Sequence, residues 1–110
     1  IVGDVGQGVL RDRRVLAEEG VVVIVATVDS ALHKVITGPE LITRGWVYAP
    51  EADNLLDEAE AHIEKALVKA LDDGISDIDS LERIVRKAAG KFVSDRTKRR
   101  PMIVPVVMTT

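Results

Sequence analysis

The sequence predicts an α+β fold: a three-stranded sheet in the order 2-1-3, built ββααβ, with two antiparallel helices on one face. Three observations lead to this prediction. Residues 21–28 are an unbroken run rich in Val and Ile, and a second such run lies near the end of the chain. Between them, apolar residues recur with the period of amphipathic helices. If the first run is the central strand, the last strand lies parallel to it through a crossover that contains both helices.

The run at residues 21–28 is the clearest strand signal. β-branched side chains are restricted at χ1 and suit a pleated sheet, and Gly20 and Asp29 bound the run. Because polar residues do not alternate with apolar ones, we expect both faces of this strand to be covered. The residues expected to face the helices are Val22, Ile24, Ala26 and Val28.

Two helices can cover only one face of a sheet, so the other face of the central strand needs a partner. A second subunit or a neighbouring domain would supply it. The residues predicted for this interface are Val21, Val23 and Val25.

The second strand is expected in two pieces, residues 34–37 and residues 40–48, with a bulge or bend at Gly38-Pro39 between them. A short loop after residues 21–28 predicts an antiparallel hairpin. Ile42 and Trp46 are its candidate core residues.

The first helix is expected to begin at Pro50, which suits the first helical turn, and to end at Gly74. A second helix is expected to start near Asp77 or Asp79, because Asp79 and Glu82 have the spacing of a capping box. Gly90 inside this helix suggests the close approach of another backbone.

Pro101 ends the second predicted helix, because it biases the preceding residue away from the helical region. Residues 102–108 then form the third strand, and Pro105 predicts that it is an edge strand.

Composition narrows the classes of protein. The chain has 110 residues, which predicts one domain, and its net charge of −3 is unlike that of a typical nucleic-acid binder. It contains no cysteine, which excludes disulfides and is compatible with the cytoplasm. No apolar stretch is long enough to span a membrane. The chain lacks an initiator Met, so we expect an excised piece of a longer protein.

Residues with catalytic or metal-binding spacing are missing from the sequence. His33 and His62 are far apart and form none of the usual zinc motifs. No catalytic or metal-ligating residue is therefore predicted.

Two basic clusters are candidate contacts with RNA or with another domain. Phosphates are neutralised by Arg and Lys, although a solvated face, or cations that complement a helix C-terminus, would explain the same residues. The candidates are Arg11, Arg13 and Arg14 in the first cluster and Arg96, Lys98, Arg99 and Arg100 in the second.

Three motifs together resemble one family. The motifs are Gly3-Asp4-Val5-Gly6 followed by residues 9–14, Gly38-Pro39-Glu40 followed by residues 44–48, and residues 97–103. They look like the C-terminal portion of bacterial ribonuclease J, of the metallo-β-lactamase and β-CASP ribonucleases. The resemblance covers essentially the whole chain. It identifies residues 1–19 as the end of an interdomain linker and residues 20–110 as a C-terminal α/β domain.

This resemblance implies a cytoplasmic RNA-processing and RNA-degrading hydrolase with 5′-to-3′ exonuclease and endonuclease action. Its zinc ions are held by motifs of the metallo-β-lactamase region that do not occur in these residues. The implied role here is that of a non-catalytic domain, inactive alone, with no cofactor in this segment. Its partners would be the catalytic domains, a second copy in a homodimer and, for the parent enzyme, RNA. An autonomous RNA-binding module that uses residues 96–100 is the alternative.

Overall fold

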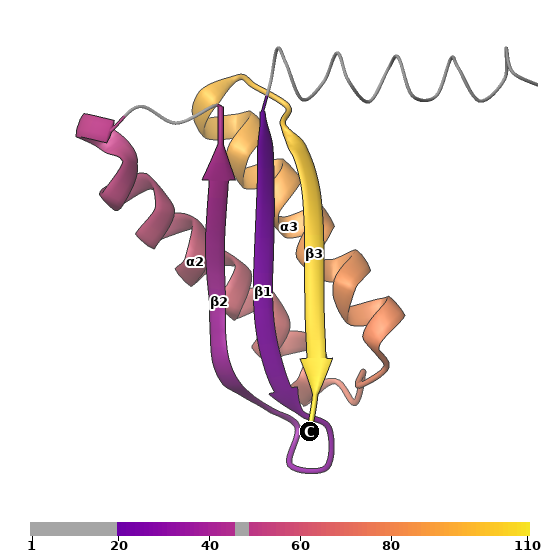
Figure 1. Ribbon diagram of the computed structural model, residues 1–110. Helices are drawn as coiled ribbons and strands as arrows, with labels where there is room; N and C mark the ends of the chain where they lie inside the picture. The colour runs from indigo at the N-terminus through magenta and orange to yellow at the C-terminus, as the bar shows by residue number, and fades with distance from the viewer. Residues whose placement is uncertain (1–19, 46–48) are drawn as a thin grey trace, which may run out of the picture.

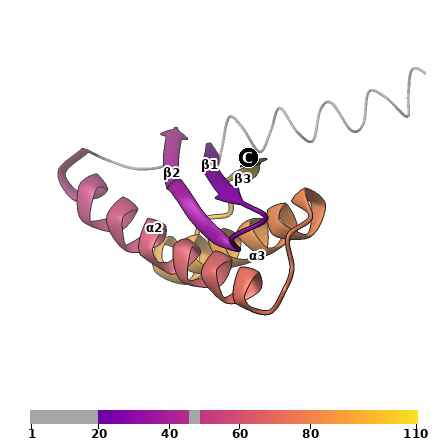
Figure 2. The same ribbon diagram turned by 90° about the horizontal axis from the view of Figure 1, so that it is seen from below.

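The computed structural model describes residues 20–45 and 49–110, and the side chains of the second range from residue 54 onward. The sheet has the order β2-β1-β3, in which β1 is antiparallel to β2 and parallel to β3. Both helices lie against the same face of this sheet (Figures 1 and 2). The predicted fold class is confirmed. The elements in chain order are β1 (Val21–Asp29), β2 (Lys34–Arg44), α2 (Ala49–Asp72), α3 (Ile78–Thr97) and β3 (Met102–Thr109).

The predicted hairpin joins β1 to β2 through residues 30–33. Asp29 ends β1 and closes the turn, because its Oδ1 atom accepts hydrogen bonds of 2.9 Å from the backbone N–H groups of both Ala31 and Leu32. A short carboxylate that bonds the backbone two residues ahead is a common way to start a turn. The β-branched run of β1 and this aspartate therefore determine the hairpin together.

The predicted irregularity at Gly38-Pro39 is also confirmed. The register of β1 with β2 shifts between Val25 and Thr27 and again between Thr27 and Val28. Gly38 has a φ of +87°, and an added Cβ there would lie 2.6 Å from the carbonyl oxygen of Val25. Only glycine fits at this point of closest approach.

One core prediction on β2 is wrong. Ile42 pairs with Val23 and is 42% exposed, whereas its neighbour Leu41 pairs with Ile24 and is 7% exposed. Side chains alternate along a strand, so a shift of one residue exchanges the two faces. The other candidate, Trp46, lies outside the described residues, and β2 ends at Arg44.

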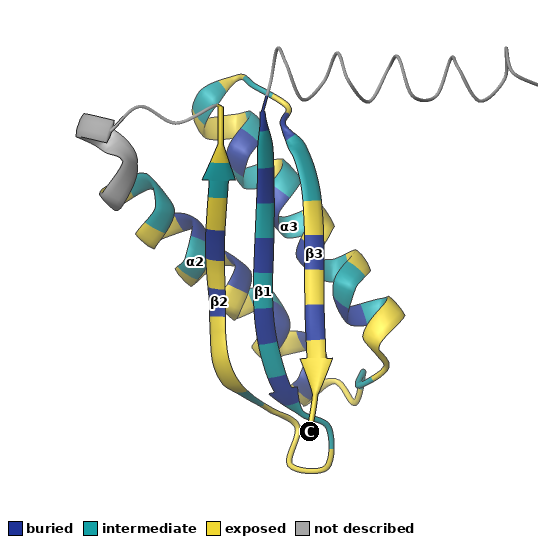
Figure 3. Cartoon of the chain, in the orientation of Figure 1, coloured by how far each residue is buried: buried dark blue, intermediate teal, exposed yellow. Residues whose placement is uncertain are grey.

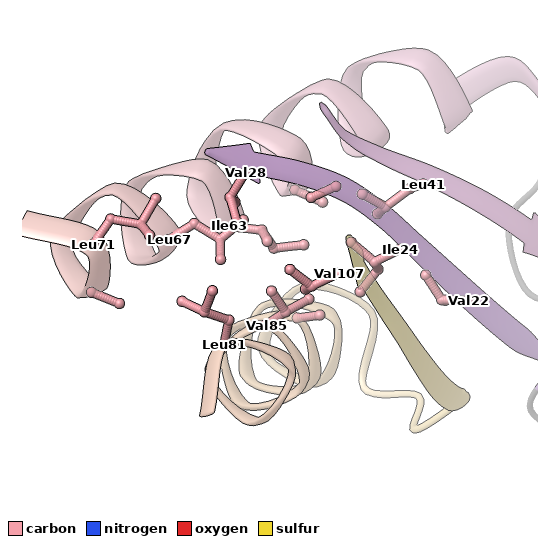
Figure 4. Packing of buried hydrophobic residues seen from close by; sticks show 14 of the residues in the cluster. Val22, Ile24, Val28, Leu41, Ile63, Leu67, Leu71, Leu81, Val85 and Val107 are labelled. Atoms are coloured by element: carbon pink, nitrogen blue, oxygen red, sulfur yellow. The ribbon is translucent and has the colours of Figure 1, made fainter. Parts of the chain in front are cut away.

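The core lies between the sheet and the helices (Figure 4). All four residues of β1 that were expected to face the helices are buried there, with 2% exposure or less. They pack with Leu and Ile side chains of α2, such as Ile63 and Leu67, and with Leu81 and Val85 of α3. Alternation on β1 and the apolar stripes of the two helices thus build one core.

The helix ends mostly follow the predicted residues. Gly74 follows α2 with a φ of +89°, and its N–H donates to the carbonyl of Leu71 at 3.0 Å. The N-cap of α3 is Asp77, whose Oδ2 atom accepts from the Ser80 N–H at 3.0 Å. The capping box predicted from Asp79 and Glu82 does not form, because Asp77 already caps the helix.

The expectation for Gly90 is wrong. No atom of another element lies within 4 Å of a Cβ built on this residue. The glycine is therefore not required by a close backbone contact.

We expect Ile24→Ala to lower the free energy of unfolding by about 3 kcal/mol, because it leaves a cavity in a fully buried site. Ile42→Ala is the matched control on the exposed face of the sheet and should cost less than about 1 kcal/mol. Urea denaturation of both variants measures the difference. Equal losses would show that the two faces of the sheet are packed alike.

The cap of α3 should be sensitive to pH. Hydrogen bonding by the Ser80 side chain, and then by its backbone N–H, lowers the pKa of Asp77 below its ordinary value of 3.8. Because the folded pKa lies below the unfolded one, the ionised carboxylate stabilises the fold above about pH 4, and this effect is lost as the pH falls through the folded pKa.

Asp77→Ala should therefore lower the Tm by a few degrees at neutral pH, and the difference from wild type should narrow as the solution is acidified. Asp77→Asn keeps a capping oxygen without a charge, so its Tm difference from the Ala variant should not change with pH. Thermal unfolding followed by circular dichroism measures both. A wild-type advantage over Ala that is constant down to about pH 2 would contradict this role for the carboxylate.

Candidate functional site

The face of the sheet that points away from the helices is the candidate site, and we call it the open face. Strand register aligns its side chains in rows that run across the three strands. Neither helix covers it, as Figures 1 and 2 show. Its members are Val21, Val23, Val25 and Thr27 of β1, Thr37, Glu40, Ile42 and Arg44 of β2, and Met102, Val104, Val106 and Met108 of β3.

Most of this open face is apolar. Its outer strands carry exposed Ile42, Val104, Val106 and Met108, each between 36% and 46% exposed. In Figure 3, β1 alternates between buried and half-buried residues, and the outer strands carry exposed residues beside it. Exposed apolar side chains that gather on one face are typical of an interaction surface.

The three valines predicted for an interface lie in the middle of the open face. Val21, Val23 and Val25 are half-buried, because the neighbouring strands shield their flanks. No described element of the chain lies over them in Figure 1. These three valines face away from both described helices, and their role as an interface stays a prediction.

Two charged residues border Ile42 on β2. Arg44 shares a row with Val21, and Glu40 shares a row with Val25. Four residues of strand separate them by roughly 13 Å, which is too far for an ion pair within one chain. Arg44 donates instead to the carbonyl of Thr43, at 2.7 Å.

Both outer edges of the sheet are closed by glutamates from the helices. On β2, the Leu41 N–H donates to Glu60 Oε2 of α2 at 3.1 Å. On β3, the Val107 N–H donates to Glu82 Oε2 of α3, also at 3.1 Å. Each bond satisfies an N–H that another strand could otherwise pair with.

A proline precedes each of these capped N–H groups by two residues. Alternate residues of an edge strand point their backbone N–H groups away from the sheet. Pro39 and Pro105 occupy the outward-pointing positions next to Leu41 and Val107, and proline has no N–H to offer there. Together the proline and the glutamate remove two consecutive donors from each edge. Glu60 did not stand out in the sequence, because it lies among other charged helix residues, and the spacing of Glu82 predicted a capping box instead of this contact.

The second basic cluster is partly engaged within the fold. Arg96 forms an ion pair with Glu58 of α2, and its guanidinium lies 5.3 Å from the centre of the Phe92 ring. Lys98 is the left-handed C-cap of α3, with its N–H on the Ser94 carbonyl at 2.9 Å. The Arg99 N–H donates to Thr97 Oγ1 at 3.1 Å, and Arg100 is exposed.

The first basic cluster, Arg11, Arg13 and Arg14, lies outside the described residues. Contacts of either cluster with RNA or with another domain stay predictions.

Within the two described ranges, no group of three or more His, Asp or Glu side chains could hold a metal ion. His62 lies beside Phe92, with ring centres 5.5 Å apart. The described helices include none that is both long and apolar enough to cross a membrane.

Comparison with known proteins shows to which family the chain belongs. The model of the ribonuclease J C-terminal domain family matches residues 8–110. The chain belongs to this family. It is 37% identical over 107 residues to ribonuclease J2 of Bacillus subtilis, and 41% identical over 106 residues to ribonuclease J 2 of Staphylococcus epidermidis. The resemblance seen in the three sequence motifs is confirmed.

The ribonuclease J matches cover nearly all of this chain but only a small part of each relative. They cover 97% and 96% of this chain but only 19% of the length of each relative. A ribonuclease J 2 of Staphylococcus aureus shows the same proportion at 39% identity. This chain therefore corresponds to less than a fifth of the length of these relatives.

The glutamate on β2 should protect its edge. In Glu60→Ala, the Leu41 N–H loses its acceptor, so its amide exchange should become roughly tenfold faster, which corresponds to a cost of about 1.4 kcal/mol. Glu64→Ala, on an exposed part of the same helix, is the matched control and should leave Leu41 unchanged. Hydrogen exchange followed by NMR measures both. Unchanged protection of Leu41 in the Glu60 variant would show that the bond does not close the edge.

Proposed function

We propose that this ribonuclease J C-terminal domain is non-catalytic and supports the oligomerisation and activity of its parent enzyme. The parent would be an RNA-processing and RNA-degrading hydrolase with 5′-to-3′ exonuclease and endonuclease action, located in the cytoplasm. The observation that carries the proposal is the open face, whose apolar residues are exposed on the outer strands and half-buried on β1. Burial of such a face gains roughly 25 cal/mol for each Å² removed from water.

The shape of the domain supports an assembly role. Its three-stranded sheet buries one face under α2 and α3 and presents the other (Figure 2). Sheets covered on a single side usually show polar residues on the other, but here the polar residues among those of the open face are Glu40, Arg44, Thr27 and Thr37, and the rest are apolar. The excess of apolar side chains is what an interface would require.

Catalysis is assigned to the part of the parent enzyme outside this chain. Zinc, which the resemblance places in the metallo-β-lactamase region, has no fitting ligand set among the described residues. In this proposal, RNA is cleaved by the catalytic domains of the parent enzyme and not by this domain.

RNA binding by the cluster at residues 96–100 is less well supported. Arg96 is paired with Glu58 and packs on Phe92, so one cation of this cluster already has partners within the fold. Exposed Lys98 and Arg100 remain able to contact a phosphate, but among the described residues no exposed Phe, Tyr or Trp side chain is available to stack on bases.

A charge placed on the open face tests the assembly role. Val104→Glu puts a carboxylate among the valines of the sheet, so the chain should sediment as a monomer at concentrations where the wild type associates. Val68→Glu is the matched control, because Val68 is 40% exposed on α2 and Val104 is 36% exposed on β3. Sedimentation velocity measures the association, and circular dichroism checks the fold. A wild-type chain that stays monomeric into the millimolar range, or a Val104 variant that associates like the wild type, would contradict the proposal.

A further inference from the structure

We infer that two copies of this chain pack open face against open face about a two-fold axis perpendicular to the strands, so that Glu40 of each copy meets Arg44 of the other. The inference rests on the proposed self-association and specifies its geometry. Three features of the structure support it: the closed edges, the order of the rows on the open face, and the positions of the two charges.

The closed edges direct association to the face. Two copies of a sheet protein can join either by pairing edge strands or by stacking faces. On β2, Pro39 and the Leu41–Glu60 bond remove consecutive outward donors, and on β3 Pro105 and the Val107–Glu82 bond do the same. Strand addition would have to break one of these bonds, whereas stacking breaks none.

The open face has a central apolar row with one charged residue on either side of it. The central row holds Ile42, Val23 and Val104. Arg44 belongs to the row toward one end of the strands, and Glu40 belongs to the row toward the other end. A two-fold axis along the central row exchanges the two outer rows.

This exchange places β2 over β2 of the second copy and Arg44 over Glu40 of that copy. The apolar central rows then face each other, as in an isologous interface. Two such ion pairs form for each dimer, and both lie on the outermost strand, where water still reaches them.

The other simple arrangement is unfavourable. An axis parallel to the strands would place β2 over β3 of the second copy. Arg44 would then face Met102, and Glu40 would face Val106, because these residues share rows. Water reaches these rim charges in either arrangement, but only the perpendicular axis gives each of them an opposite charge, so the charges favour that axis.

The size of the surface predicts a weak dimer for the isolated chain. Three strands about 4.8 Å apart and the three rows that this axis superimposes give a footprint of roughly 14 by 20 Å. This area of roughly 280 Å² on each copy is below the usual size of a specific interface, so we expect a dissociation constant between the micromolar and the millimolar range. A second copy is favoured as the partner because the charges on this face complement those of an identical face.

Charge reversal tests the arrangement. In Glu40→Arg, each Arg44 would face an arginine of the second copy, and in Arg44→Glu each Glu40 would face a glutamate. Each variant alone should dissociate roughly tenfold or more readily than the wild type. An equimolar mixture of the two variants should recover association, because every pair in the mixed dimer joins opposite charges.

Glu64→Arg is the control, since it reverses an exposed charge of the same chain away from the sheet. It should associate like the wild type. Sedimentation velocity of each variant, of the mixture and of the control measures association, and circular dichroism verifies that the variants fold.

The outcomes separate this geometry from the proposed function. If Val104→Glu dissociates the chain but the two reversals have no effect, or the mixture does not recover, the perpendicular two-fold arrangement is overturned while self-association through the face stands. If the wild type does not associate at all, both are overturned. If each variant dissociates by itself and the mixture of the two associates again, the pairing of Glu40 with Arg44 of the second copy is supported.

Discussion

The structure depends on one constraint: β1 is the middle strand of a three-stranded sheet, but the described helices α2 and α3 cover the same single face of it. Alternation divides its side chains into two sets. Val22, Ile24 and Val28 have no exposed surface, whereas among the described elements the adjoining strands alone shield Val21, Val23 and Val25. The hairpin, the crossover and both helices serve to bury the first set. The second set is left over by the same geometry, because a strand that is apolar on both faces cannot be satisfied by one layer of helices.

A sheet with an apolar open face would be at risk of uncontrolled association if its edges were also available. Here the helices that form the core also close the edges, because α2 supplies Glu60 and α3 supplies Glu82. Each helix therefore performs two functions with two of its faces: the apolar stripe packs on the sheet, and a glutamate beside that stripe reaches the backbone of the outer strand. The helices thus contact the backbone of both sheet edges but leave the open face uncovered.

Patterns within single elements were readable from the sequence, and relations between elements were not. The run of valines, the helical periods and Pro105 predicted the strand order, the crossover and the edge position of β3. The phase of β2 was misjudged, because Gly38-Pro39 interrupts the alternation that would have distinguished Leu41 from Ile42. The partners of Glu60 and Glu82 depend on which strand edge passes each helix. Helix spacing alone gave Glu82 a local capping role that Asp77 performs instead.

The functional relevance of the charged residues was also not readable from the sequence. The most basic segment, residues 96–100, is the conspicuous feature of the sequence, yet Arg96 is held by Glu58 and Phe92, and Lys98 ends α3. Two inconspicuous residues, Glu40 and Arg44, instead lie on the exposed apolar surface at either side of Ile42. A charge at the rim of an apolar face adds little binding energy but penalises wrong partners and wrong orientations. In this domain of ribonuclease J, the apolar rows would therefore provide the affinity of an interface, and these two charges would determine its orientation.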